Sequence, residues 1–287
     1  MKPSPFAYSA PESLDEVLRV LADVGSDGKV LAGGQSLLPI LNMRLAAPSH
    51  IVDINRLPGL AFVQVDESGV RVGARARHAD VERDDEAHRV LPLLRQALRL
   101  VAHPVIRNRG TTVGSLAHAD PAGEMTAVLA LTGGTVELAR LGSTRTVGAA
   151  DFFLAPLESA VQAGELAVSA FFPAFPSRTG TAFVEVARRH GDYAMCGVAA
   201  AVTLDADGAV VAARTAYVSV GPTPTVVDLT ETVTGRPAAT ADWGPAAELA
   251  RASVEPESDI HASADYRSHL TGVLTERALR AAAGAAA

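Results

Sequence analysis

Cysteine is almost absent from this chain, since Cys196 is the single one among 287 residues. An intramolecular disulfide is therefore excluded, as is an iron–sulfur cluster or a cysteine-rich zinc site made by this chain alone. Such cysteine usage is typical of a reducing compartment. Residues 1–6 lack the apolar core of a signal peptide, and no run of about 18 uncharged apolar residues occurs. We therefore expect a cytoplasmic protein without a membrane span.

Positive charge is also scarce. The formal net charge is −7, and no basic stripe with interleaved aromatic residues is present, so we expect no nucleic-acid partner. His78, His103 and His190 lack a second ligand at helical spacing, and we predict no metal site. The length suits two domains of roughly 100–200 residues each.

Hydrophobic periodicity predicts a mixture of helices and strands. Ser13 and Glu16 form a capping box at the start of the first helix. The predicted helices cover residues 14–24, 78–84, 90–102, 121–131, 245–253 and 264–282. The predicted strands cover residues 29–32, 50–54, 61–65, 70–74, 135–139, 144–147, 198–204 and 210–220, and residues 106–119 are expected to be irregular. This order indicates an α+β fold rather than a doubly wound sheet.

A glycine pair marks the first candidate site, which we call the first turn (residues 32–37). Strand residues run into Gly33 and Gly34, and Ser36 stands where it can cap a helix beginning near Leu37. Glycines allow a close backbone approach, and a helix N-terminus favours a phosphate group. The first turn is therefore a candidate nucleotide-phosphate site, although a simple strand-to-helix connection is the alternative.

A second candidate site lies at residues 107–124, and we call residues 109–115 the second turn. Its glycines, hydroxyl residues and arginines suit a pyrophosphate. The alternatives are structural: Arg107 and Arg109 as surface ion-pair formers, His118 as a hydrogen-bonded structural histidine, and Glu124 as a carboxylate favoured by its helix N-terminus.

Five ordered blocks resemble one family, the flavin-binding medium subunits of molybdenum hydroxylases of the carbon monoxide, nicotine and xanthine dehydrogenase type. The family patterns are A-G-G-[QH]-S-L-L-P, R-L-A-x-P-x-x-[LI]-[VI]-D-I, H-P-x-I-R-N-R-G-T-I-G-G-S-L-A-H-A-D-P-A-A-E, D-F-F-x-G before P-G-E-L, and R-R-x-G-D-Y-A. They correspond here to residues 32–39, 44–54, 103–124, 151–155 with 163–166, and 188–194.

The resemblance implies a vanillyl-alcohol-oxidase-type (PCMH) FAD-binding domain at residues 1–176, with lobes at about 1–57 and 58–176, followed by a C-terminal domain of antiparallel sheet plus helices at residues 177–287. The boundary falls where Pro173, Pro176 and Gly180 cluster. The implied FAD-binding residues are Ala32, Gly33, Gly34, Gln35, Ser36, Leu37, Thr111, Gly114, Ser115, His118, Glu124 and Tyr193. A partly buried core aromatic is the alternative for Tyr193.

Three positions depart from the family patterns. Val113 stands where a glycine is usual, and a β-branched residue resists positive φ and adds bulk close to a phosphate site. Ala76 replaces a threonine in the pattern G-A-x-T-x-H, and Ala155 replaces the glycine after D-F-F.

The function implied by the resemblance is electron transfer. The chain would accept electrons on FAD from an iron–sulfur small subunit, within a complex that also holds a large subunit with the molybdenum cofactor, and would pass them to an external acceptor. No catalytic acid–base residue is then required, because the flavin carries the redox chemistry. The alternatives are a stand-alone FAD-dependent oxidoreductase acting on a small molecule and a protein that keeps the fold but has lost FAD.

Overall fold

The computed structural model describes residues 2–286 and begins with a small parallel sheet. Its strands are β1 (Ala7–Ser9), β2 (Gly28–Leu31) and β3 (His50–Asp53), in the order β1-β3-β2. They are connected by α1 (Leu14–Val24), η1 (Gly25–Asp27) and α2 (Leu37–Asn42). The predicted helix and two strands are confirmed, whereas the three-residue strand β1 was not predicted.

The capping prediction for α1 is confirmed in part. The Ser13 hydroxyl accepts a hydrogen bond from the Glu16 amide at 3.3 Å, as a capping box requires. The Glu16 carboxylate, however, accepts from the amide of Glu12 at 3.1 Å. Glu16 therefore stabilises the residue before the cap.

A five-stranded antiparallel sheet follows, in the order β4-β5-β10-β6-β7. Its strands are β4 (Val63–Asp66), β5 (Gly69–Gly73), β6 (Thr135–Arg140), β7 (Ser143–Gly148) and β10 (Leu166–Pro173). The two predicted hairpins, β4–β5 and β6–β7, are confirmed. The central strand β10 was not predicted, yet it joins the hairpins into one sheet. Its residues are almost all buried, so they lack the alternation that marks a half-exposed strand.

Helices and a short hairpin complete this second region. They are α3 (His78–Arg83), α4 (Asp85–Val90), α5 (Pro92–Leu98), α6 (Pro104–Arg107), α7 (Thr112–His118), α8 (Glu124–Thr132), α9 (Ala149–Phe152), β8 (Phe153–Ala155) and β9 (Glu158–Ser159). The helix predicted over residues 90–102 is present but shorter, because α4 ends at Val90 and α5 runs only from Pro92, at its first position, to Leu98.

Two further predictions in this region need correction. Residues 106–119, expected to be irregular, contain the end of α6 and all of α7, because Thr111 caps a helix that tolerates Gly114. The helix predicted from Pro121 begins at Glu124 instead, since the Gly123 amide donates to the Asp120 carbonyl in a turn.

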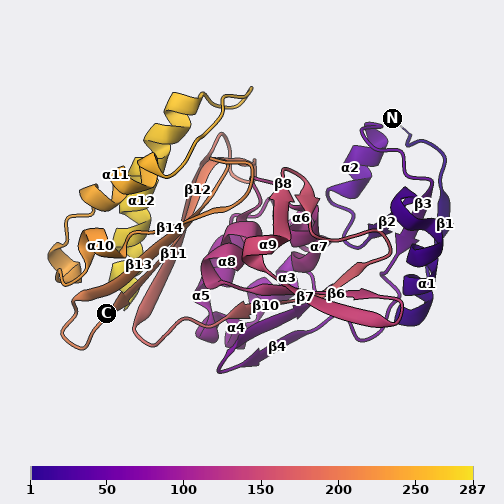
Figure 1. The fold of residues 1–287 in the computed structure, drawn as a ribbon, viewed down its shortest axis with the longest axis horizontal. Helices are drawn as coiled ribbons and strands as arrows, with labels where there is room; N and C mark the ends of the chain where they lie inside the picture. Colours follow the sequence, from indigo (N-terminus) through magenta and orange to yellow (C-terminus); the bar gives the residue numbers. More distant parts are fainter. Residues whose placement is uncertain (1, 287) are drawn as a thin grey trace.

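The C-terminal region is a four-stranded antiparallel sheet covered by helices. Its strands run in sequence order: β11 (Thr179–Ala187), β12 (Ala194–Leu204), β13 (Val210–Val218) and β14 (Thr225–Asp228). The remaining elements are α10 (Thr230–Val233), η2 (Ala238–Thr240), α11 (Gly244–Ala252) and α12 (Ala264–Ala286). The predicted β12–β13 hairpin and both long helices are confirmed, and α12 covers one face of the sheet (Figure 1).

Strand β12 is buried on both faces and joins the two halves of the molecule. Ala199 and Ala201 belong to the core shared with the five-stranded region, whereas Val198, Ala200 and Val202 belong to the core beneath α11 and α12. The alternation of side chains along a strand produces this division. Small alanine side chains let the strand lie close to elements on both sides.

Hydrogen bonds also cross between these halves. The Ser219 amide donates to the Pro121 carbonyl at 2.8 Å, and the Gln96 side-chain amide donates to the Thr181 carbonyl at 2.9 Å. The seam between the halves therefore runs directly beside the start of α8. No helix within residues 2–286 is both long and apolar enough to cross a membrane.

Candidate functional site

The first turn connects β2 to α2 and leaves several amides without partners. Gly34 has a φ of +74°, a conformation that favours glycine. The Leu38 amide donates to the Gly34 carbonyl at 3.1 Å, which starts the helical hydrogen bonding. Gln35, Ser36 and Leu37 are partly exposed residues, and their amides donate to no acceptor within residues 2–286. Three such amides at a helix start suit an anionic ligand.

Ser36 occupies the predicted cap position without capping through its side chain. Its backbone is helical, with φ −100° and ψ −47°, and its hydroxyl accepts no bond from the first turn of α2. A capping serine normally has an extended backbone that points its oxygen back at these amides. The predicted side-chain role is therefore wrong, and the neighbouring amides are left free.

The second turn is more tightly bonded. Thr111 has the extended backbone of an N-cap, and its hydroxyl accepts from the Gly114 amide at 3.2 Å. The Ser115 amide donates to the Thr111 carbonyl at 3.0 Å. A Cβ on Gly114 would lie 2.5 Å from the Thr111 hydroxyl, so a side chain at position 114 would displace the capping oxygen. The hydroxyl groups of Thr111, which is buried, and Ser115 donate to no acceptor within residues 2–286.

The two turns are in direct backbone contact. A Cβ built on Gly33 would lie 2.5 Å from the Arg109 carbonyl oxygen and 2.7 Å from the Gly110 Cα. Segments 76 residues apart in the chain therefore meet only because position 33 has no side chain. This is the juxtaposition that the pyrophosphate hypothesis requires.

His78 supports the second turn from the interior. Its amide donates to the Gly110 carbonyl at 2.9 Å, and its Nδ1 is 3.2 Å from the Thr112 hydroxyl. Burial lowers the pKa of His78 to about 4, and the nearby Arg107 cation adds to this effect. The ring is therefore neutral at pH 7. In the sequence His78 was considered as a metal ligand and set aside, and it ends the G-A-x-T-x-H block, but this supporting role had no signal of its own.

The two arginines of the second segment have different environments. Arg107 is buried and pairs with Glu82 at 2.8 Å while donating to the carbonyls of Val101 and Ala102. Arg107 therefore forms an ion pair, as the structural alternative predicted, but this pair lies in the interior and not on the surface. Arg109 is exposed and forms no ion pair within residues 2–286, so its charge is free to attract an anion.

Glu124 lies at the first position of α8, where its carboxyl group is buried at the seam. Burial raises its pKa to about 8, with contributions from Glu185 on β11 and from Asp120. The pKa of Glu185 is raised to about 7 by burial, and its Oε2 has no hydrogen-bond partner. Glu124 is therefore protonated at neutral pH and can donate as well as accept a hydrogen bond.

Tyr193 extends from the loop before β12 and is 66% exposed, so the alternative of a core aromatic is wrong. Desolvation and the carboxyl groups of Asp120 and Glu124 raise its pKa, which indicates that it lies near the start of α8. The same loop packs on the second region, since a Cβ on Gly191 would lie 2.6 Å from the His103 ring.

His118 ends α7 and is partly exposed, with no hydrogen bond to another side chain within residues 2–286. The structural interpretation of His118 as a bonded histidine is therefore not supported. Val113, in contrast, has an ordinary helical backbone and is 2% exposed within the core. The expectation that Val113 crowds the phosphate site is wrong, because its side chain is buried in the core.

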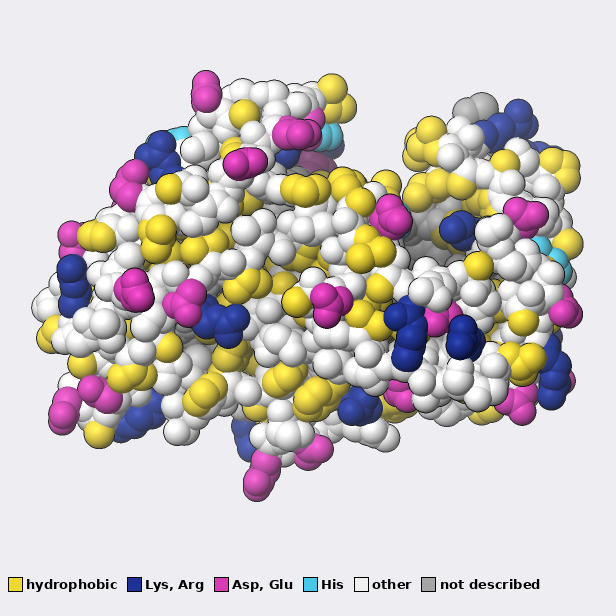
Figure 2. Space-filling model, in the orientation of Figure 1, with side chains coloured by type: hydrophobic (Ala, Val, Ile, Leu, Met, Phe, Trp, Pro, Cys, Tyr) yellow, Lys and Arg dark blue, Asp and Glu magenta, His cyan; other side chains and the backbone are white. Residues whose placement is uncertain are grey.

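The space-filling view shows a hollow between the small N-terminal region at the upper right and the body of the molecule (Figure 2). Figure 1 places α2 on one side of this hollow and α6, α7 and β8 on the other. Exposed hydrophobic residues on these elements include Leu38, Val105 and Leu154. Elements on both sides of the hollow therefore carry exposed apolar residues.

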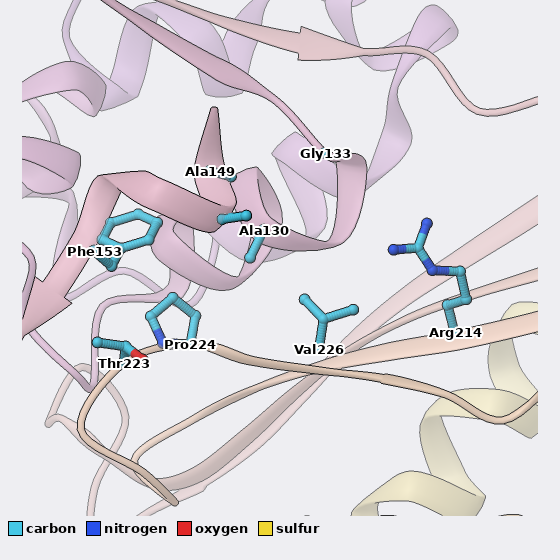
Figure 3. Close-up of a pocket in the computed structure, with 9 residues that line it drawn as sticks. Ala130, Gly133, Ala149, Phe153, Arg214, Thr223, Pro224 and Val226 are labelled. Carbon is cyan, nitrogen blue, oxygen red and sulfur yellow. The ribbon is translucent and has the colours of Figure 1, made fainter. Parts of the chain in front are cut away.

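A separate pocket of about 360 Å³ lies at the opposite end of α8 (Figure 3). Ala149 and Phe153 form one side, and Pro224, Val226 and Arg214 form the other. Arg214 is its one charged lining residue. This pocket contains none of the residues predicted from the sequence, which gather instead around the two turns and the start of α8.

Comparison with known proteins identifies the family. The family described as the FAD binding domain in molybdopterin dehydrogenase matches residues 4–175, and the CO dehydrogenase flavoprotein C-terminal domain matches residues 181–282. The chain therefore belongs to the FAD-binding medium-subunit family of molybdenum hydroxylases.

Relatives and solved structures match over the whole chain. The alpha subunit of the 6-hydroxypseudooxynicotine dehydrogenase complex of Paenarthrobacter nicotinovorans is 39% identical, covering 97% of this chain and 95% of that protein. The carbon monoxide dehydrogenase medium chain of Hydrogenophaga pseudoflava is 36% identical, covering 98% of each. Quinoline 2-oxidoreductase from Pseudomonas putida 86 superposes with a TM-score of 0.93 at 38% identity, covering 100% of this chain and 99% of that one.

Proposed function

We propose that the diphosphate of FAD binds between the two turns. Ala32, Gly33, Gly34, Gln35, Ser36 and Leu37 form one side of this site, and Thr111, Gly114 and Ser115 form the other. The observation that carries the proposal is the contact of Gly33 with the Arg109–Gly110 backbone, which joins the first turn, with its three unpaired amides, to the second turn. The exposed Arg109 cation adds favourable charge for an anion.

Glu124, His118 and Tyr193 complete the proposed site toward the flavin. The protonated Glu124 can donate a hydrogen bond to a ribityl hydroxyl or a flavin acceptor without placing a negative charge at the seam. Tyr193 offers an exposed aromatic ring against which a flat ring system can pack. When bound, FAD supplies the redox chemistry, because it accepts and releases one or two electrons.

The proposed role is electron transfer within a complex. Electrons would arrive from an iron–sulfur small subunit, whose complex also contains a large subunit with the molybdenum cofactor, and would leave to an external acceptor. Relatives are described as subunits of dehydrogenase complexes, which supports this assembly. The residues of this chain bind and orient the cofactor, and none is required as an acid–base catalyst.

The proposal includes the domain division and the cellular location. Residues 1–176 would form the FAD-binding domain and residues 177–287 the C-terminal domain, in keeping with family matches that end at residue 175 and resume at residue 181. A cytoplasmic location is supported by the single buried free thiol, Cys196.

The purified chain tests this proposal by its visible spectrum. Flavin absorption bands, present on isolation or restored by added FAD, are expected, together with co-purification of an iron–sulfur subunit. A protein that stays colourless with added FAD would contradict the proposal and favour a fold-retaining protein that has lost the cofactor. A flavoprotein that oxidises a small molecule without partners would favour the stand-alone enzyme.

A further inference from the structure

We propose that Asn55 and Arg77 form a brace that holds the two turns in register for the diphosphate. This inference rests on the proposed function. Neither residue belongs to the two turns, and neither was expected from the sequence to take part in the site. They act through backbone carbonyls of the turns, so they are positioning residues.

Asn55 fixes the first turn. Its side-chain Nδ2 donates to the Ala32 carbonyl at 2.8 Å and to the Asp53 carboxylate at 2.6 Å. Its Oδ1 accepts from Arg77 Nη2 at 2.7 Å. The opposite amide orientation would place Oδ1 against two acceptors and Nδ2 against a cation, so the network determines how the side chain lies.

Arg77 continues the connection to the second turn. Its Nη1 donates to the Arg109 carbonyl at 2.6 Å. Its backbone is fixed beside Thr111 by a bridge between the two segments, and its amide donates to Asp80 at 3.0 Å. One planar guanidinium therefore spans from Asn55 to the second turn, a geometry that the single ammonium group of lysine cannot reproduce.

The brace also affects the electrostatic environment of a bound diphosphate. The carbonyls of Ala32 and Arg109 belong to backbone next to the proposed site, and a carbonyl oxygen aimed at a phosphate would repel it. Both oxygens accept hydrogen bonds from the brace, and in this proposal those bonds keep them directed away from the ligand. Loss of the brace frees both carbonyls and lets the turns separate.

A double-mutant cycle tests whether the two residues act as one unit. The variants are Asn55→Ala, Arg77→Gln and the combination, and the readout is the dissociation constant for FAD from flavin fluorescence. We expect each single variant and the double variant to weaken binding about tenfold, because either change breaks the same connection. If the two residues contributed independently, the dissociation constant of the double variant would instead rise about a hundredfold.

Arg83→Gln is the matched control, because Arg83 lies exposed at the end of α3, the helix that Arg77 precedes, and its side chain forms no hydrogen bond within residues 2–286. We expect it to bind FAD like the unmodified chain. Arg77→Lys should recover only part of the affinity, since lysine keeps the charge but cannot serve both acceptors. Full recovery by lysine would show that charge alone matters and would overturn the brace.

Competition by ADP separates positioning of the turns from general destabilisation. ADP carries the diphosphate without the flavin, so its inhibition constant should rise by the same factor as the FAD dissociation constant in Arg77→Gln. An unchanged FAD affinity would overturn the proposal. Weakened FAD binding with unchanged ADP binding would also overturn it, because the effect would then lie outside the diphosphate site.

Hydrogen exchange of the unliganded protein keeps the brace testable if the proposed function fails. Should the unmodified chain bind neither FAD nor ADP, the proposed function is refuted. The brace then predicts faster exchange of the hydrogen-bonded amides of Leu38, which donates to Gly34, and Gly114, which donates to Thr111, in Arg77→Gln but not in Arg83→Gln. Equal exchange in the two variants would refute the brace as well.

Discussion

The two turns of the candidate site differ in whether their backbone amides already donate hydrogen bonds within the protein. In the first turn, the amides of Gln35, Ser36 and Leu37 have no acceptor within residues 2–286. In the second, Thr111 accepts from Gly114 through its side chain and from Ser115 through its carbonyl. The first turn therefore offers donors to a ligand, whereas the second is a preformed support against which it is positioned.

Gly33→Val should have the largest effect, because it forces the two turns apart. Its Cβ would lie 2.5 Å from the Arg109 carbonyl oxygen, which is backbone and cannot rotate away. We expect FAD binding to weaken by at least about a hundredfold, since displacement of about 1 Å at a site has effects of that size. The measurement is the flavin-to-protein ratio after purification.

Gly148→Val is its control, because a Cβ at Gly148 meets nothing within 4 Å and its φ of −71° suits valine. Normal flavin content is expected there. Normal flavin content in Gly33→Val would contradict the contact between the turns.

Thr111→Val tests the internal bonding of the second turn. Loss of the capping hydroxyl should lower the free energy of unfolding by about 1–2 kcal/mol, as measured by urea denaturation, and should also reduce FAD affinity. Thr111→Ser keeps the oxygen and should restore both properties. If serine restored stability but not FAD affinity, the methyl group rather than the hydroxyl would be the important contact.

The sequence was sufficient to locate both turns, because their glycines are local signals, but not to predict the difference between them. The cap at Thr111 and the helix α7 that follows it were missed, since residues 106–119 were expected to be irregular. Whether an amide is free depends on backbone angles, and Ser36 shows this, because its helical φ and ψ prevent the predicted capping bond. The brace of Asn55 and Arg77 joins residues 22 apart and has no local signature.

Glu124→Gln tests the electrostatics next to the second turn in the FAD-free chain. The pKa of Glu124 is raised to about 8, so its contribution to stability is complete below its ordinary value near 4.5 and is lost as pH rises through about 8. Glu185 and Asp120 favour protonation, whereas Arg107 opposes it. We expect Tm to fall between pH 6 and 9, and to fall less in the Glu124→Gln variant.

Glu67→Gln, an exposed change at the turn between β4 and β5, is the control and should leave the pH profile unchanged. An equal fall of Tm in Glu124→Gln and the unmodified chain would show that Glu124 is ionised at neutral pH.

Val113→Ala should have the smallest effect on the cofactor, although it lies within α7. Its side chain is in the core, so the change should lower the free energy of unfolding by about 2 kcal/mol. The FAD dissociation constant should stay within about twofold, because additivity holds for sites that share no partners. A large loss of FAD affinity at unchanged stability would place Val113 at the phosphate site after all.

Helix α1 was predictable because one buried face determines it. The β12–β13 hairpin was predictable because residues 205–208, which include Asp207 and Gly208, are a strong turn signal between two apolar runs. Strand β10 was not, since it is buried on nearly every residue and pairs with two hairpins far away in the chain. The proximity of the carboxyl groups of Glu124 and Glu185 could not be predicted for the same reason, because the two residues are far apart in the chain. Their raised pKa values arise from packing across the seam rather than from any spacing in the sequence.

Amide hydrogen exchange with and without FAD is the most direct test of the central claim. If the first turn supplies the free donors, FAD and ADP should both protect residues 35–37 strongly, with little change at Gly114 and Ser115, whose amides are already bonded. FAD binding without protection of residues 35–37 would contradict the account.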